Sequence, residues 1–439
     1  MDLLVVGAIV EKKTALLFID PNTGENLSAP SEQKTLAPID YISGLGKTGG
    51  EKIYHLLEWS LTKNHKTWSF IIVATSSGRL LVISIRPEDR RQSEVFTVNG
   101  TDAGPEGRKI QFWTKYMFKR PDPIYSVTGF SDGLLWCSGT KLLCETLDLK
   151  DKKFRHVAEY ELPSPATTIS YDNGLIYALT NCHSLEILRL TLDGEGGGSI
   201  RRTHGDQVTR DSLHHAYLNR TVGRPVHLVS DKHCSVVGLW ATQDTKADTL
   251  ETVFEAELPH SVLRFRPGRC RPVWDPYWTS NGTDLRSSPT ANANGVEIVP
   301  RSANRSELLG LSIDGSLSQF TTLDTTEWKF LRFLVNLAIR SPKVCEFTYK
   351  DDSAPLEPLA APKLLMHVDG DILKRCLVQR SLGELLRLGQ TTDEGTKIFT
   401  KFYELLQELH GGALNELADP AVYVEQAYAD LGFYLRPVL

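Results

Sequence analysis

Two different periods of apolar residues divide the chain. As far as about Leu323, short runs of β-branched and aromatic residues alternate with glycine-containing turns, the pattern that predicts antiparallel hairpins. From Asp324 onward, apolar residues recur at helical spacing, which predicts α-helices. The sequence therefore predicts a β domain over residues 1–323 and an all-α domain over residues 324–439.

Four stretches of the β domain share one hairpin design. In each, two apolar runs flank a turn, the turns being Ser76-Ser77-Gly78, Asp132-Gly133, Asn173-Gly174 and Asp314-Gly315. The first three glycines recur at intervals of roughly 40 to 55 residues, the length of one four-stranded propeller blade. The predicted fold is thus mainly β, a β-propeller of the seven-bladed type with degenerate blades. The sequence leaves open whether all seven blades are present.

Two polar segments interrupt this pattern. Residues Gly194 to Arg210 are rich in glycine and arginine, and Arg271 to Arg305 are rich in proline, glycine and asparagine. Such compositions are typical of loops. We expect both segments to project from the propeller, where insertions between strands are tolerated.

The helical domain is predicted from its start and stop signals. Asp324 and Glu327 have the spacing of a capping box, as do Ser381 and Glu384. The first helix is apolar over most of its circumference, which predicts that other elements cover it on more than one side. Its narrow polar face consists of Lys329, Arg332, Asn336 and Arg340. The further predicted helices span Ile372 to Arg380, Ser381 to Leu388, Thr396 to Leu409, and a final segment opening at Asp419-Pro420.

Composition narrows the function classes. The chain has 439 residues, 41% hydrophobic and 23% charged, with a net charge of −5, which is ordinary for a globular protein and gives no general attraction to nucleic acid. The apolar run at Leu3 to Val10 lacks the features of a signal peptide, and no run is long enough for a membrane helix. Seven scattered cysteines without a Cys-x-x-Cys pair indicate reduced thiols in the cytosol or nucleus.

Asp369-Gly370-Asp371 has two competing interpretations. Asp-x-Asp pairs bind metal ions, but a divalent cation needs several oxygen ligands, and the residues that follow are apolar, basic or cysteine. The structural interpretation is that Gly370 supplies a turn closed to other residues and an aspartate caps the next helix. We favour this helix start and predict no metal site.

No motif predicts a reaction or a cofactor. Gly46-Lys47-Thr48 matches the end of a phosphate-binding loop, but Tyr41 stands where its first glycine is required. The pair His214-His215 lies on a predicted strand, where neighbouring side chains point to opposite faces. We therefore predict no catalytic residue, no cofactor and no small-molecule substrate.

A basic cluster keeps a nucleic-acid function open. It comprises Arg264, Phe265, Arg266, Arg269 and Arg271. The arginines are candidate contacts to phosphates, and Phe265 is a candidate for stacking on a base. The alternative is that the arginines form a solvated rim on an acidic protein.

The order of these features resembles the C-terminal third of one family of nuclear proteins. That family comprises the large subunit of the damage-specific DNA-binding protein, the A subunit of the cleavage and polyadenylation specificity factor, and a related splicing-factor subunit. The sharpest match is Val368-Asp369-Gly370-Asp371-Ile372-Leu373 with Leu377, similar to the family's Ile-Asp-Gly-Asp-Leu followed by Phe-Leu. Cys376 stands where the family usually has phenylalanine. The resemblance covers Leu3 to His410.

The resemblance implies a scaffold function. Family members hold partner proteins in DNA repair through cullin-type ubiquitin ligases, or in pre-mRNA processing, and the chain would correspond to their last propeller and helical tail. We therefore expect a non-enzymatic nuclear adaptor that binds other subunits, with the cytoplasm as a second compartment. An aromatic end segment is expected to dock on the propeller or to bind a partner as a helix in a groove; its candidate partner-binding residues are Tyr423, Tyr428, Leu431 and Tyr434.

Overall fold

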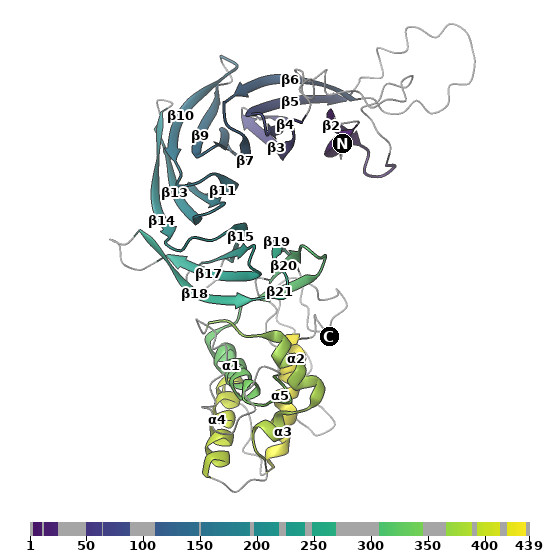
Figure 1. The fold of residues 1–439 in the computed structure, drawn as a ribbon, viewed down its shortest axis with the longest axis vertical. Coiled ribbons are helices and arrows are strands. Elements are labelled where there is room, and N and C mark those ends of the chain that lie inside the picture. Colours follow the sequence, from purple (N-terminus) through teal and green to yellow (C-terminus); the bar gives the residue numbers. More distant parts are fainter. Residues whose placement is uncertain are drawn as a thin grey trace, which may run out of the picture. The chain divides into compact units, whose positions relative to one another are not determined.

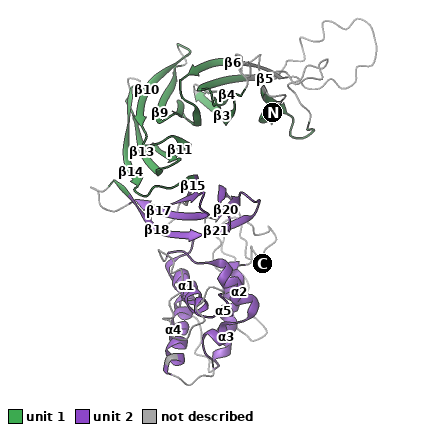
Figure 2. Ribbon diagram, viewed as in Figure 1, with its two compact units in different colours: residues 1–212, 243–249 green, residues 213–242, 250–439 purple. Residues whose placement is uncertain are grey.

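The computed structural model describes residues 3–10, 13–24, 50–63, 65–87, 110–148, 151–193, 197–218, 225–241, 248–268, 307–345, 366–388, 393–412 and 419–435. These residues are mainly β-strand, followed by C-terminal helices (Figure 1). They divide into two compact units, Met1–Ser212 with Gln243–Thr249 and Leu213–Thr242 with Leu250–Leu439 (Figure 2). The predicted change from strands to helices near residue 324 is confirmed. It falls inside the second unit, so a domain boundary at that point stays a prediction.

The first unit consists of consecutive antiparallel strands. A hairpin, β1-β2, precedes the four-stranded sheets β3-β4-β5-β6 and β7-β8-β9-β10 and the four-stranded run β11-β12-β13-β14. Strands adjacent in sequence are therefore adjacent in the sheet. The bounds are Leu4–Val10 (β1), Lys13–Ile19 (β2), Ile53–Lys63 (β3), Lys66–Thr75 (β4), Arg79–Pro87 (β5), Ile110–Lys119 (β6), Ile124–Phe130 (β7), Gly133–Ser138 (β8), Lys141–Asp148 (β9), Lys153–Glu161 (β10), Ala166–Asp172 (β11), Leu175–Thr180 (β12), Ser184–Leu192 (β13) and Gly198–Asp206 (β14).

The first strands of these sheets lie next to one another. β7 contacts both β3 and β11, and the apolar side chains between adjacent sheets form two cores. The indole Nε1 of Trp59 in β3 donates a hydrogen bond to the Phe130 carbonyl oxygen of β7 at 3.0 Å. The hydroxyl of Ser126 in β7 accepts one from the Ile169 backbone N–H of β11 at 2.9 Å. Packing and hydrogen bonds thus join successive sheets.

The predicted hairpins form at their glycine-containing turns. β4 pairs with β5, β7 with β8, β11 with β12, and β20 with β21, all antiparallel. Gly78 has a φ of +76°, and a Cβ at this position would lie 2.2 Å from the Arg120 carbonyl oxygen. Only glycine meets both requirements. The four hairpin predictions are therefore confirmed.

The second unit begins with the run β15-β16-β17-β18, in which β17 pairs antiparallel with β16 and β18, and the three-stranded sheet β19-β20-β21. Val226, Val236, Val262 and Phe265 belong to the core between them. The bounds are Ser212–Leu218 (β15), Val226–Asp231 (β16), Ser235–Ala241 (β17), Thr249–Glu257 (β18), Val262–Pro267 (β19), Glu307–Ser312 (β20) and Leu317–Thr321 (β21). The described residues contain four complete groups of four consecutive strands. The count of seven blades stays a prediction.

Among the described residues, five helices follow, and all of them contribute to one apolar core. Asp324 caps the first helix, and the reciprocal bond from Glu327 completes the predicted capping box. α1 contacts both α2 and α4, and α5 contacts α2, α3 and α4. The prediction that the first helix is covered on more than one side is therefore confirmed. The bounds are Thr325–Ile339 (α1), Gly370–Gln379 (α2), Leu382–Leu385 (α3), Asp393–Leu409 (α4) and Pro420–Leu435 (α5).

Two local predictions are wrong. Residues 198–206, within a predicted loop, form β14, because their backbone pairs antiparallel with β13. Arg202 on this strand also forms ion pairs with Glu186 of β13 and with Asp248, each at 2.6 Å. Ser381 precedes α3 but makes no side-chain cap bond, so the second capping box does not form. The predicted loop over 271–305 lies outside the described residues.

Candidate interaction surfaces

Asp369 is the N-cap of α2. Its Oδ1 accepts hydrogen bonds from the backbone N–H groups of Asp371 at 2.9 Å and Ile372 at 3.3 Å. This satisfies two of the N–H groups that a helix leaves without intrahelical partners. Among the described residues, no group of three or more His, Cys, Asp or Glu side chains is arranged to hold a metal ion. The arrangement thus fits the helix-start interpretation.

The role predicted for Gly370 needs a correction. Gly370 is the first residue of α2 and has no positive φ. A Cβ added there would meet only Leu435, at an ordinary contact distance of 3.7 Å. The turn therefore does not exclude other residues at this position, because Asp369 alone supplies the cap.

The basic cluster is only partly on the surface. Arg264 and Arg266 are exposed on β19, whereas Phe265 between them is buried, with an exposed fraction of 2%. The Phe265 ring packs edge-on against Phe320 of β21, with 5.4 Å between ring centroids. Phe265 therefore cannot stack on a base, and that part of the prediction is wrong. Two further members of the cluster lie outside the described residues, namely Arg269 and Arg271.

The basic strand lies beside a group of histidines. The Nδ1 atom of His214 accepts a hydrogen bond from the Phe265 backbone N–H at 3.3 Å. Burial, together with the charges of Arg264 and Arg266, lowers the pKa of His214 to about 4. Burial also lowers the pKa of His215 well below its usual value, and its Nε2 lies 3.2 Å from Nδ1 of His227. The imidazoles of His214 and His215 are therefore held neutral.

The four aromatic and aliphatic residues predicted to bind a partner lie on α5. Tyr423, Tyr428 and Leu431 are buried in the helical core. The hydroxyl oxygen of Tyr428 accepts a hydrogen bond from the Leu382 backbone N–H at 2.8 Å. These three side chains are therefore not available to a partner, and the prediction for them is wrong. An aromatic segment with an apolar face is also what a core helix requires.

Tyr434 is partly exposed and also has an internal role. Its hydroxyl donates a hydrogen bond to Oε1 of Glu327 in α1 at 3.1 Å. Because Glu327 belongs to the capping box of α1, this bond ties the end of α5 to the start of α1. The end segment therefore packs within the helices of its own unit.

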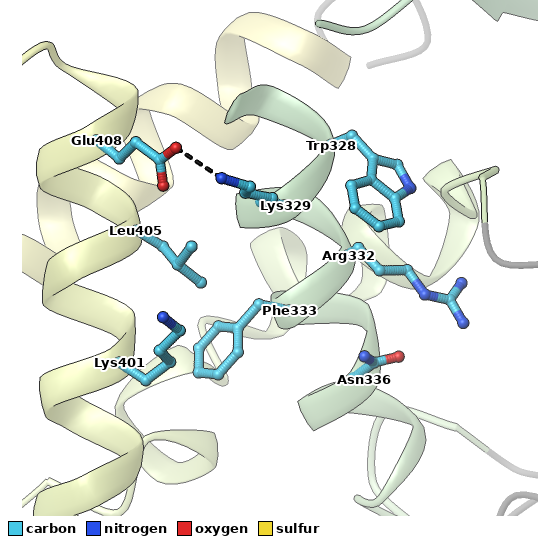
Figure 3. Close-up of a pocket in the computed structure, with 8 residues that line it drawn as sticks. All are labelled: Trp328, Lys329, Arg332, Phe333, Asn336, Lys401, Leu405 and Glu408. Atoms are coloured by element: carbon cyan, nitrogen blue, oxygen red, sulfur yellow. Dashed lines mark hydrogen bonds and ion pairs between the residues drawn. The ribbon is translucent and has the colours of Figure 1, made fainter. Parts of the chain in front are cut away.

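A hollow of about 280 Å³ lies over α1 and extends to α4. Figure 3 shows Lys329 and Phe333 reaching from α1 toward α4, and Trp328, Arg332 and Asn336 along the other flank of α1. The apolar lining is Trp328, Phe333 and Leu405, and the polar lining is Lys329, Arg332, Asn336, Lys401 and Glu408. We call this feature the α1 groove.

The cations of the α1 groove differ in their partners. The Nζ atom of Lys329 lies 2.7 Å from Oε1 of Glu408, and that of Lys401 lies 3.1 Å from Oε2 of Glu404. Arg332 is buried, with an exposed fraction of 7%. Its single hydrogen bond to a described residue runs from Nη1 to the His367 carbonyl oxygen at 3.4 Å, and its Nε is buried without a partner. Sequence reasoning placed Arg332 on a polar face and missed its burial.

The comparisons with known proteins leave the family open. No protein-family model matches the sequence, and no curated protein sequence matches it. Among the described residues, no helix is both long enough and apolar enough to span a membrane. The resemblance found in the sequence therefore remains the basis for a functional proposal.

Proposed function

We propose that the chain is a non-enzymatic nuclear scaffold, and that its sheets are successive blades of a β-propeller. The observation that carries the proposal is the regular succession of four-stranded antiparallel meanders in which β3, β7 and β11 lie next to one another. In a propeller, the first strand of each blade lines the centre, so first strands of adjacent blades are neighbours. A rigid stack of blades presents many loops on a fixed core, which suits the binding of several partners.

The resemblance supports two settings for this scaffold, DNA repair through cullin-type ubiquitin ligases and pre-mRNA cleavage or splicing. It rests on Val368–Leu373 with Leu377, where Asp369 caps α2. A structural motif of this kind supports a shared architecture and does not choose the pathway.

Affinity purification of the tagged full chain from nuclear extract, followed by mass spectrometry, tests the proposal. We expect near-stoichiometric recovery of subunits of one complex, and ligase, polyadenylation or splicing subunits would each identify the pathway. A Leu431→Ala chain, in which a fully buried α5 side chain is truncated, shows whether recovery needs the folded helices. A chain that leaves the extract as a free monomer and recovers no subunit refutes the scaffold.

A second candidate function is nucleic-acid binding through β19. The observation in its favour is that Arg264 and Arg266 are both exposed on this strand and that no described carboxylate forms an ion pair with either. Binding through phosphates weakens steeply with salt. A double Arg264→Gln, Arg266→Gln chain should then bind a single-stranded oligonucleotide more weakly and with a shallower salt dependence. Equal binding by both chains removes this candidate.

A further inference from the structure

Arg332 is a buried cation for which the described residues provide no counter-charge. A guanidinium loses its hydration when it is buried, and the loss is costly unless a carboxylate or several acceptors replace the water. Among the described residues, Arg332 has one long hydrogen bond to a carbonyl oxygen and no ion pair. Burial accordingly lowers the pKa of Arg332. Binding of an anion to Arg332 would therefore offset the free-energy cost of burying its charge.

The surroundings of Arg332 indicate what kind of anion this is. Trp328 lies one helical turn before Arg332 on the same flank of α1, and Phe333 and Leu405 line the rest of the groove (Figure 3). Both lysines of the lining already have carboxylate partners, so the groove offers one unsatisfied positive charge among aromatic and aliphatic side chains. A nucleic-acid strand needs several cations for its phosphates, and the groove offers only this one cation without a described carboxylate partner. A peptide supplies both a single carboxylate and apolar side chains.

We propose that the α1 groove binds an acidic peptide segment of a partner protein, with an Asp or Glu carboxylate on Arg332 and an adjacent apolar side chain against Trp328, which lies on the same flank of α1. This inference rests on the proposed scaffold function and names the kind of segment that one of its partners presents. Because arginine and carboxylate form two parallel hydrogen bonds, the pairing also fixes the orientation of the segment.

The test uses the full chain and a display library of random short peptides. We expect the enriched peptides to place Asp or Glu next to an aromatic or aliphatic residue. For one enriched peptide, fluorescence anisotropy should show that Arg332→Gln weakens binding at least about tenfold, the usual effect of removing one partner of a buried charge pair. Replacing the peptide's acid by its amide should weaken binding to the wild-type chain equally, and should have no further effect on Arg332→Gln.

Arg340→Gln is the matched control. It removes the same charge from the exposed end of α1, outside the groove lining, and should change affinity by less than about twofold. If Arg332→Gln does not fold, the affinity of a Lys401→Glu chain for the peptide is the deciding measurement. Lys401 is exposed in the groove lining, and reversing its charge should weaken peptide binding at least about threefold. Enriched peptides without an acid, unchanged affinity in the deciding variant, or displacement of the peptide by a single-stranded oligonucleotide would overturn the assignment.

The same variants separate this inference from the scaffold proposal. If wild-type and Arg332→Gln chains recover the same nuclear subunits in equal amounts and Arg332→Gln also keeps its peptide affinity, the groove assignment fails while the scaffold stands. If neither chain recovers any subunit but peptide affinity depends on Arg332, the groove assignment stands and the scaffold fails.

Discussion

Acidification should destabilise the second unit through His214. The Nδ1 atom of this residue accepts a hydrogen bond from the Phe265 backbone N–H, so the folded state requires a neutral ring. The folded-state pKa is about 4, against 6.5 for the unperturbed side chain. Between these two values the unfolded chain binds a proton that the folded chain does not. The free energy of unfolding must therefore fall as the pH falls through this window.

The size of the effect follows from the two pKa values. Between pH 7.5 and pH 5, the linkage relation gives a loss of about 2 kcal/mol in the free energy of unfolding from His214 alone. His215 shifts in the same direction and adds to the loss. Because part of the shift at His214 comes from the exposed arginines Arg264 and Arg266, high salt should reduce it.

Hydrogen exchange followed by mass spectrometry measures the opening free energy of individual strands, here in peptides from β15 and β19. The exchange rates are first corrected for the intrinsic effect of pH on exchange. The comparison is His214→Asn, whose Oδ1 can replace the Nδ1 acceptor but cannot be protonated in this range. We expect the opening free energy of these strands to depend less on pH in the variant, by about 2 kcal/mol over the same interval. Identical pH dependence in the two chains, or greater protection at pH 5 than at pH 7.5, would refute the reasoning.

Three other substitutions test the packing, the capping and the buried charges. Leu431→Ala should lower the free energy of unfolding of the helices by about 2 to 5 kcal/mol in urea titrations, whereas Val378→Ala, at a side chain with an exposed fraction of 67%, should cost less than about 0.5 kcal/mol. Asp369→Ala should cost about 1 kcal/mol by loss of the cap, and added Ca²⁺ should not change the melting temperature of the wild-type chain. Arg202→Gln should cost about 1 to 3 kcal/mol because it leaves the buried Glu186 without its cation, an effect that solvent reduces at the partly exposed Arg202; raising the pH further above neutrality should not restore the loss.

Elements that depend on local signals were predictable from the sequence. The hairpin at Gly78 has apolar runs on both sides and a turn that only glycine allows, so its position follows from residues close in the chain. The start of α1 likewise depends on Asp324 and Glu327, three residues apart. Neither needs knowledge of the tertiary fold.

Burial of particular side chains was less predictable, because it depends on distant residues. Phe265 and its neighbours Arg264 and Arg266 form one cluster in the sequence, but a strand alternates its faces, so the ring enters the core while the arginines leave it. Tyr423 and Tyr428 are of a residue type that is common in binding surfaces, but in the structure they are buried in the helical core. The choice between the two is made by α2, α3 and α4, which cover them.

Residues distant in sequence also determine whether a basic side chain forms an ion pair. In the sequence, Arg202 lies in a predicted loop and Arg332 on the polar face of a predicted helix, and neither pattern reveals what the basic side chain contacts. The fold brings Glu186 and Asp248 to Arg202, from 16 and 46 positions away, on a strand that pairs with β13. It places Arg332 on a helix between α2 and α4 and brings it no described carboxylate. The charge of Arg202 is therefore balanced within the described structure, whereas for Arg332 we expect the balancing carboxylate to come from a partner peptide. The peptide affinities of the Arg332 variants measure that difference.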